Sequence, residues 1–133
     1  MAFVHGKNTY VSLNAVDLSA YTNSSELSRG ADSHDTTTYG QTAHTFAGGL
    51  LNHSASMEGI YDNTASVGPR AAIVALVGTN VTMVRRPEGT GVGKPQDSAT
   101  VLVQEYVETS PVADMVKWSV KLQVSGAITA TTQ

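Results

Sequence analysis

The feature that most constrains the fold is a strict alternation of apolar and polar residues in the segment 116–125, which reads VKWSVKLQVS. Every second residue is apolar, and the series includes the only tryptophan, Trp118. Successive side chains of a strand point to opposite faces, so residues 115–125 are predicted to form a half-buried antiparallel strand with Trp118 in the core. Such a strand needs partners from elsewhere in the chain.

Other segments offer those partners. Segments rich in β-branched and aromatic residues, separated by turn residues, are predicted strands at 9–13, 23–29, 52–62, 81–86 and 98–108. One helix is predicted at about residues 66–77, with Ser66 as N-cap, Pro69 in the first turn and Gly78 after the end. This pattern predicts a mainly β fold, an antiparallel β-sandwich or barrel with one flanking α-helix, in a single domain of residues 1–133. The last residues, GAITATTQ, are expected to be a tail too polar to bury itself.

The segment of about residues 30–49 is unusual, because it is long, rich in threonine and nearly uncharged. Its sequence HDTTTYGQTAHTFAGGL favours an extended arm or hairpin that turns at Gly40. A free edge of this kind is an aggregation hazard, so we expect a neighbouring copy to cover the arm by strand addition. The alternative is an internal hairpin or Ω-loop packed on its own domain.

Composition supports a covered surface. Only 14% of the residues are charged, against about 25% in typical globular domains. This is expected of a subunit whose surface is covered by neighbours, although many β-sandwich monomers are also rich in Ser and Thr. The net charge of -3 argues against a protein that grips nucleic-acid phosphates, but it permits a surface that DNA slides past. No signal-peptide pattern and no apolar run of membrane-spanning length is visible, so no membrane contact is expected.

No pattern of reactive residues stands out. The chain has no cysteine, which excludes disulfides and thiolate zinc sites, and its four histidines are scattered, although His44 and His53 could meet across a hairpin. The triplet SHD at 33–35 points to alternate faces of a strand, and GTGVGK at 89–94 lacks the flanking residues of a phosphate loop. We therefore predict no catalytic residue, no cofactor and no metal, with a small hydrolase as the disfavoured alternative.

Several longer motifs occur in a defined order: VSLNAVDLS at 11–19, DTTTYGQT at 35–42, FAGGL at 46–50, YDNTA at 61–65 and SPVADMVKWSVKLQVSG at 110–126. Together they resemble the major tail proteins, or tail tube proteins, of long-tailed bacteriophages, especially those of actinobacterial hosts. The resemblance covers nearly the whole chain.

The resemblance implies a structural virion protein and not an enzyme. It implies the tail-tube fold, assembled as hexameric rings that stack into a hollow tube through which genomic DNA passes during ejection. The implied partners are further copies of the chain, the tape measure protein in the lumen, and tail terminator and distal tail proteins at the tube ends. The implied location is the virion, after assembly in the host cytoplasm.

Two sets of residues are assigned to this assembly. Glu58 and Asp62, on the less apolar face of their strand, are predicted to line the lumen. Contacts between subunits are predicted for Asp35, Thr36, Thr37, Thr38, Tyr39, Gly40, Thr45, Phe46, Gly48 and Gly49. The alternative is another virion β-module: a capsid decoration protein, a tail terminator or a glycan-binding protein. The single tryptophan falls in the core pattern, which counts against glycan binding.

Overall fold

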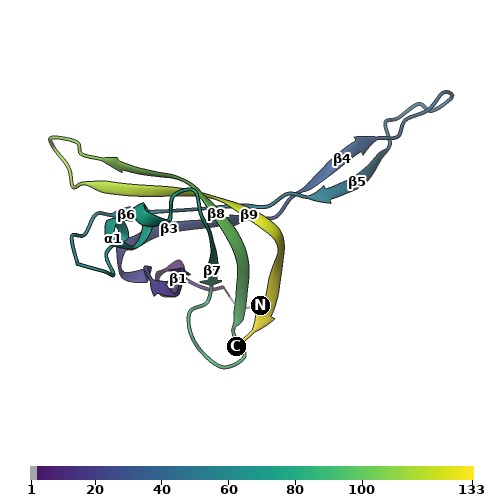
Figure 1. Ribbon diagram of the computed structural model, residues 1–133. Helices are drawn as coiled ribbons and strands as arrows, with labels where there is room; N and C mark the ends of the chain where they lie inside the picture. The colour runs from purple at the N-terminus through teal and green to yellow at the C-terminus, as the bar shows by residue number, and fades with distance from the viewer. Residues whose placement is uncertain (1–2) are drawn as a thin grey trace.

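The computed structural model describes residues 3–133 and is built almost wholly from antiparallel strands (Figure 1). Seven strands form one sheet in the order β2-β1-β7-β8-β9-β6-β3, and β4 and β5 form a separate two-stranded sheet. The predicted fold class, antiparallel β structure with one flanking helix and an extended arm, is confirmed. The strands are β1 Tyr10–Leu13, β2 Val16–Asp17, β3 Thr22–Ser28, β4 Ala31–Asp35, β5 Phe46–Leu51, β6 Ser54–Ile60, β7 Asn80–Arg86, β8 Pro95–Thr109 and β9 Lys117–Thr132.

The two longest strands, β8 and β9, lie next to each other near the middle of the seven-stranded sheet. Trp118 and the alternate residues after it are buried, as the sequence pattern predicts. The strand does not end near Ser125, however, but continues to Thr132. A bulge at Gly126, where φ is +88°, bends β9, and the polar tail then pairs with the first residues of β8. The tail keeps most of its side chains exposed while its backbone is paired, so its polarity is no obstacle to strand formation.

The sheet curls until its two ends face each other. Arg85 of β7 donates from Nε to the Ser25 hydroxyl of β3 at 3.2 Å, although β7 and β3 are not neighbours in the sheet. The indole Nε1 of Trp118 donates to the carbonyl of Tyr21 at 3.2 Å, which ties the start of β3 to the core. One apolar cluster fills the interior, with Val11, Leu13, Leu18, Ala55, Met57, Ile73, Met83, Ala99, Val101, Val103, Trp118, Val120, Leu122 and Val124 buried.

The helix is shorter than predicted. The α-helix α1 covers Pro69–Ile73 and continues into the 3₁₀ turn η3, Val74–Leu76. The prediction of Ser66 as N-cap is wrong, since Gly68 holds that position and Ser66 adopts a φ of +70°. Two further 3₁₀ turns, η1 at Gly6–Asn8 and η2 at Ser19–Tyr21, flank β1 and β2.

A close approach of two backbones makes Gly59 essential to the fold. A Cβ atom at Gly59 would overlap the carbonyl oxygen of Tyr21, the group that accepts the indole hydrogen bond. We expect Gly59→Ala to lower the free energy of unfolding by about 3 kcal/mol, because the clash is with backbone and cannot relax by rotation of a side chain. Urea unfolding followed by Trp118 fluorescence measures the change.

The matched control for this substitution is Gly6→Ala. Gly6 has open space around its α-carbon, and its φ is not positive. Its substitution is expected to change stability by less than about 0.5 kcal/mol. Equal stabilities of the two variants would contradict the close approach at Gly59.

Candidate assembly surfaces

The arm is a projecting hairpin that continues the ladder between β3 and β6 (Figure 1). Every residue of β4 and β5 is exposed, so the arm packs on no part of its own core and is not an internal hairpin or Ω-loop. Three contacts hold its base. Gly30 donates to His53 Nδ1 at 3.2 Å, Asn52 donates to the Gly30 carbonyl at 2.9 Å, and Arg29 forms an ion pair with the buried Asp97 at 2.7 Å. These contacts link the direction of the arm to the sheet.

Threonine hydroxyls organise the end of the arm. The Thr36 amide donates to the Thr45 carbonyl at 2.8 Å, and the two hydroxyl oxygens lie 2.9 Å apart. The Thr45 amide donates to the Thr37 hydroxyl at 2.9 Å, so the hydroxyl continues the ladder where the backbones separate. Asp35 accepts from the Thr37 amide at 2.9 Å, and the hydrogen bonds from the Thr37 side chain and then its backbone lower the pKa of that carboxyl.

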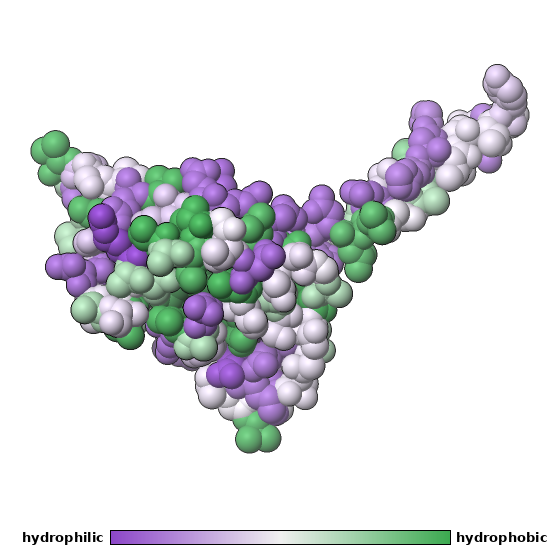
Figure 2. Space-filling model, in the orientation of Figure 1, coloured by the Kyte–Doolittle hydropathy of each residue, from purple (hydrophilic) through white to green (hydrophobic). Residues whose placement is uncertain are grey.

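Large apolar side chains also lie on the arm, without a core beneath them. The exposed fractions are 106% for Tyr39, 64% for Phe46, 81% for Leu50 and 63% for Leu51. Phe46, Leu50 and Leu51 all belong to β5, and we call these three residues the arm patch. Figure 2 shows a green area at the base of the arm, where β5 leaves the core. An exposed hairpin that carries such a patch is typical of a contact surface.

The predicted contact residues divide into two groups. The first group forms hydrogen bonds within the arm and consists of Asp35, Thr36, Thr37 and Thr45. Gly49 belongs with it, because its α-carbon lies beneath the His34 ring. The second group is exposed to solvent and consists of Thr38, Tyr39, Gly40, Phe46 and Gly48. Leu50 and Leu51 are outside the predicted contact set, which ends at Gly49, although both side chains are exposed in the structure.

Two of the free edges of the sheet, within the described residues, lie on the same four-stranded part, β3-β6-β9-β8. The strand β3 pairs only with β6, and residues 104–109 of β8 pair only with β9, since β7 pairs with β8 no further than Leu102. Gly78 and Thr79 bond to the backbone of Val103, where the covered part of that edge ends. Both edges therefore present unpaired backbone donors and acceptors.

The outer face of β3, β6, β9 and β8 is polar. A row of paired residues crosses the four strands as Glu26, Ser56, Lys121 and Glu105, and Glu58 lies in the neighbouring row. Glu58 is exposed on this face, as its strand pattern predicts. Asp62 is not on it. That residue lies in the loop after β6 and accepts from the Thr64 amide at 2.7 Å, and the hydrogen bonds from Thr64 lower its pKa.

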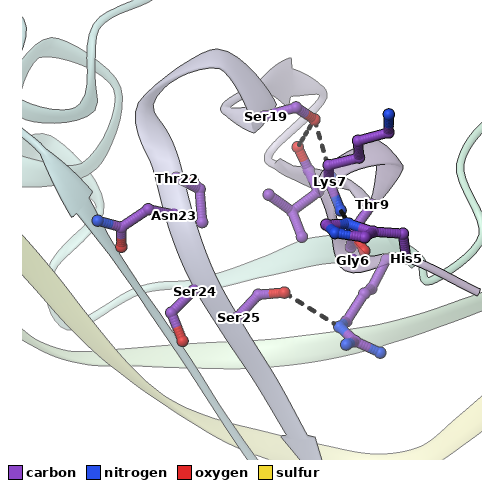
Figure 3. A pocket seen from close by; sticks show the side chains of 11 residues that line it. His5, Gly6, Lys7, Thr9, Ser19, Thr22, Asn23, Ser24 and Ser25 are labelled. Atoms are coloured by element: carbon purple, nitrogen blue, oxygen red, sulfur yellow. Dashed lines mark hydrogen bonds between the residues drawn. The ribbon is translucent and has the colours of Figure 1, made fainter.

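A polar groove of about 540 Å³ runs between η1, β1 and β3 (Figure 3). Lys7, Arg85 and His5 give it a basic character, and Ser25 bonds to Arg85 across it. His5 Nδ1 accepts from the Lys7 amide at 3.2 Å and is exposed, and Ser19 bonds to the Val11 backbone, so neither forms a nucleophile and base pair with the other.

A second hollow lies beside the helix. It has a volume of about 430 Å³ and lies between α1, η3 and the loop after β6, with Ala65, Ala71, Val74 and Ala75 among its lining residues. We call it the helix groove. Small apolar side chains dominate its helical wall, in contrast to the polar groove.

Neither metal chemistry nor a membrane helix finds support in residues 3–133. No group of three His, Asp or Glu side chains in that range could hold a metal ion. His44 and His53 belong to different parts of the hairpin: His44 bonds to Thr37 in the exposed end, and His53 is buried at the base. No helix in the same range has the length and apolar character needed to cross a membrane.

Comparisons with known proteins identify the fold. No family model and no curated protein matches the sequence. Solved structures do match over almost the full chain. The SPP1 tail tube has a TM-score of 0.77 and 11% identity, covering 98% of this chain and 80% of that one. The tail of an empty gene transfer agent particle, refined with C6 symmetry, has a TM-score of 0.75 and 15% identity over 98% and 100%. The tube-terminating cap of the anti-feeding prophage has a TM-score of 0.73 and 9% identity over 100% and 93%. The chain therefore has the tail-tube fold.

The order of the arm end depends on the Thr37 hydroxyl. We expect Thr37→Val to remove the bond that the Thr45 amide donates, at a local cost of about 1 kcal/mol, and to speed hydrogen exchange of that amide about fivefold. The same change should raise the pKa of Asp35 toward its ordinary value. Because this pKa is lowered, the Asp35 bonds are present at neutral pH and are lost as the pH falls through the lowered pKa. NMR measures both the hydrogen-exchange rate of the Thr45 amide and the pKa of Asp35.

The control for this experiment is Thr38→Val. Thr38 enters the turn through its backbone, whose amide donates to Gln41 Oε1 at 2.9 Å. We expect neither the Thr45 exchange rate nor the Asp35 pKa to change in this variant. If both variants behave alike, the Thr37 hydroxyl does not organise the arm.

Proposed function

We propose that the chain is a structural subunit of a phage-type tail tube of the actinobacteriophage kind, which assembles with copies of itself into hexameric rings stacked as a hollow conduit for DNA. The observation that carries the proposal is the projecting arm with its uncovered apolar patch, on a chain whose fold matches tail tubes over almost its full length. The C6 symmetry of the gene transfer agent tail supports six copies in a ring. No arrangement of residues in the described chain supports an enzyme.

The two free edges provide the contact that closes a ring. Seven residues of β3 and residues 104–109 of β8 lie on opposite sides of the four strands β3, β6, β9 and β8. When β3 of one copy pairs with β8 of the next, each copy satisfies one edge of its neighbour and offers its own second edge. Repeated rotation then produces a closed barrel in which neither the β3 edge nor the β8 edge is left free.

The polar outer face of the same four strands becomes the lumen wall in such a barrel. Its charged residues are three carboxylates, Glu26, Glu58 and Glu105, and two amines, Lys117 and Lys121, which give a net charge of 2 - 3 = -1 per copy. A wall that is weakly acidic and otherwise rich in Ser and Thr repels phosphate slightly and does not bind it. This suits passage of DNA and, before ejection, housing of a tape measure protein. Asp62 is proposed for the rim beside the helix groove.

The solved cap suggests a second candidate function, a tail terminator that ends the tube. A terminator and a tube subunit differ in one observable property. A tube subunit stacks on both faces and forms tubes of variable length, whereas a terminator stops at a single ring. The other proposed partners, terminator and distal tail proteins, would bind the two ends of a tube built by this chain. The finished tube would belong to the virion after assembly in the host cytoplasm.

The arm provides the direct test of assembly. We expect the concentrated protein to form hollow tubes in electron micrographs. A variant with residues 32–50 replaced by an Asn-Gly turn should remain folded, because the arm adds nothing to the buried core, but it should stay at one-copy mass. Its melting temperature should lie within about 4 °C of that of the full chain.

Three outcomes of this experiment separate the candidates. A full chain that stays at one-copy mass at high concentration contradicts the proposal. Single rings without tubes favour the terminator. An unfolded arm-replacement variant would mean that the arm belongs to the core.

The lumen assignment has its own test. Glu58→Lys changes the net charge of the polar face from -1 to 3 - 2 = +1 per copy. Tubes of this variant, assembled with short duplex DNA at about 50 mM salt, should protect the DNA from nuclease and lose that protection at about 200 mM salt. Tubes of the parent chain should protect none. The control is Glu88→Lys, in the loop between β7 and β8, and equal protection by this variant would contradict a lumenal Glu58.

A further inference from the structure

The helix groove is an apolar surface that the fold itself leaves open. The helix α1 turns Ile73 into the core, and Ala72 and Leu76 pack partly against it. Ala71, Val74 and Ala75 lie on the side that faces away. Val74 is 48% exposed, and Val67 and Val77 add exposed apolar surface nearby. A group of valines and alanines around a hollow is more than the scattered apolar residues of an ordinary surface.

Four of the eight lining residues of the helix groove are polar, and the two charged ones have partners. Arg70 pairs with Glu108 of β8 at 3.1 Å, and Asp62 bonds to Thr64. A partner that covers the groove therefore meets an arginine that is already ion-paired and a carboxylate that is already hydrogen-bonded. The polar groove differs, because none of the ion pairs in residues 3–133 includes its Lys7 or Arg85. An apolar partner fits the helix groove better than the polar groove.

The arm patch has the complementary chemistry and lies at the other end of the molecule. Figure 1 shows the arm and α1 on opposite sides of the core, and Figure 2 shows green surface near both. The arm therefore cannot reach the groove of its own chain. A donor and an acceptor on opposite sides of one chain produce a heterologous contact, which repeats from copy to copy.

We propose that the arm patch, Phe46, Leu50 and Leu51, docks in the helix groove of the next copy in the ring. This inference rests on the proposed tube function and names the partner surface of the arm. It agrees with the proposed pairing of β3 with residues 104–109 of β8. Antiparallel pairing places the end of β3, where the arm begins, toward Val103 of the next copy. Val103 is bonded to Gly78 and Thr79, so this pairing brings the arm base to the residues that directly follow η3, the segment that contributes Val74 and Ala75 to the helix groove.

The absence of cysteine makes this contact easy to test. In tubes of the double variant Leu50→Cys/Ala75→Cys, oxidation should link each copy to the next. Denaturing gels should then show a ladder of dimers, trimers and larger species, because every copy carries one donor and one acceptor. Either single variant should remain at one-copy mass. The control pair Leu50→Cys/Lys7→Cys, aimed at the polar groove, should also give no ladder.

Several outcomes would overturn the inference. Tubes of the first double variant that form under reducing conditions but give no ladder on oxidation would overturn it while leaving the proposed function intact. A ladder from the Lys7 pair would move the acceptor to the polar groove. Dimers from Leu50→Cys alone would show that arms pair with arms. A parent chain that forms no tubes fails the proposed function itself, and the inference with it.

A second measurement guards against a double variant that does not assemble. Val74→Asp places a charge in the half-exposed wall of the helix groove, where folding tolerates it, and should raise the concentration needed for assembly at least about tenfold. The control is Val92→Asp, a fully exposed valine in the loop between β7 and β8, which should assemble like the parent chain. Circular dichroism confirms that both variants are folded. Equal effects of the two substitutions would overturn the inference.

Discussion

The backbone ladder between β3 and β6 is the constraint on which the rest of the structure depends. Inside the domain this ladder is covered by a core, and alternate residues of β6 are buried beneath the sheet. Beyond Gly30 and His53 the same hairpin continues as β4 and β5 with no core beneath it. The peptide groups between the two strands stay paired, but the outer edges and the apolar side chains of the arm have no cover in a single copy. The buried core is formed within one chain, yet one chain alone leaves this surface uncovered.

The division of polar and apolar residues follows from this geometry. Threonine hydroxyls close the arm end internally, so the exposed hairpin keeps its shape without a core. Two ion pairs connect parts of the chain that are distant in sequence. Arg29 and Asp97 hold the arm base, and Arg70 and Glu108 link the helix to β8. A low charge content is therefore compatible with an ordered surface, because the surfaces that remain are sheet edges, Ser and Thr rows, and apolar patches. The proposed assembly would cover each of these with another copy of the chain.

How much could be predicted from the sequence depends on whether a signal is local. The alternation around Trp118, the faces of β6 and the first turn at Pro69 are local patterns, and the structure follows them. The bend at Gly126 could not be predicted, because it depends on how β9 pairs with the distant start of β8. The cap at Gly68 replaces Ser66 because the preceding loop adopts a positive φ at Ser66. Leu50, Leu51 and the helix groove have no motif of their own, since their exposure follows from where the core ends, which only the three-dimensional fold determines.

The proposed heterologous contact would allow modest surfaces to assemble a durable tube. The arm patch has three large side chains and the helix groove is small, so one arm in one groove is a weak contact by the standards of stable interfaces. In a closed ring every copy makes the contact twice, once as donor and once as acceptor, and the paired β3 and β8 edges hold both partners in place. Once the paired edges hold two copies together, the arm of one copy and the groove of the next belong to the same assembly. The effective concentration of the arm at the groove is then high.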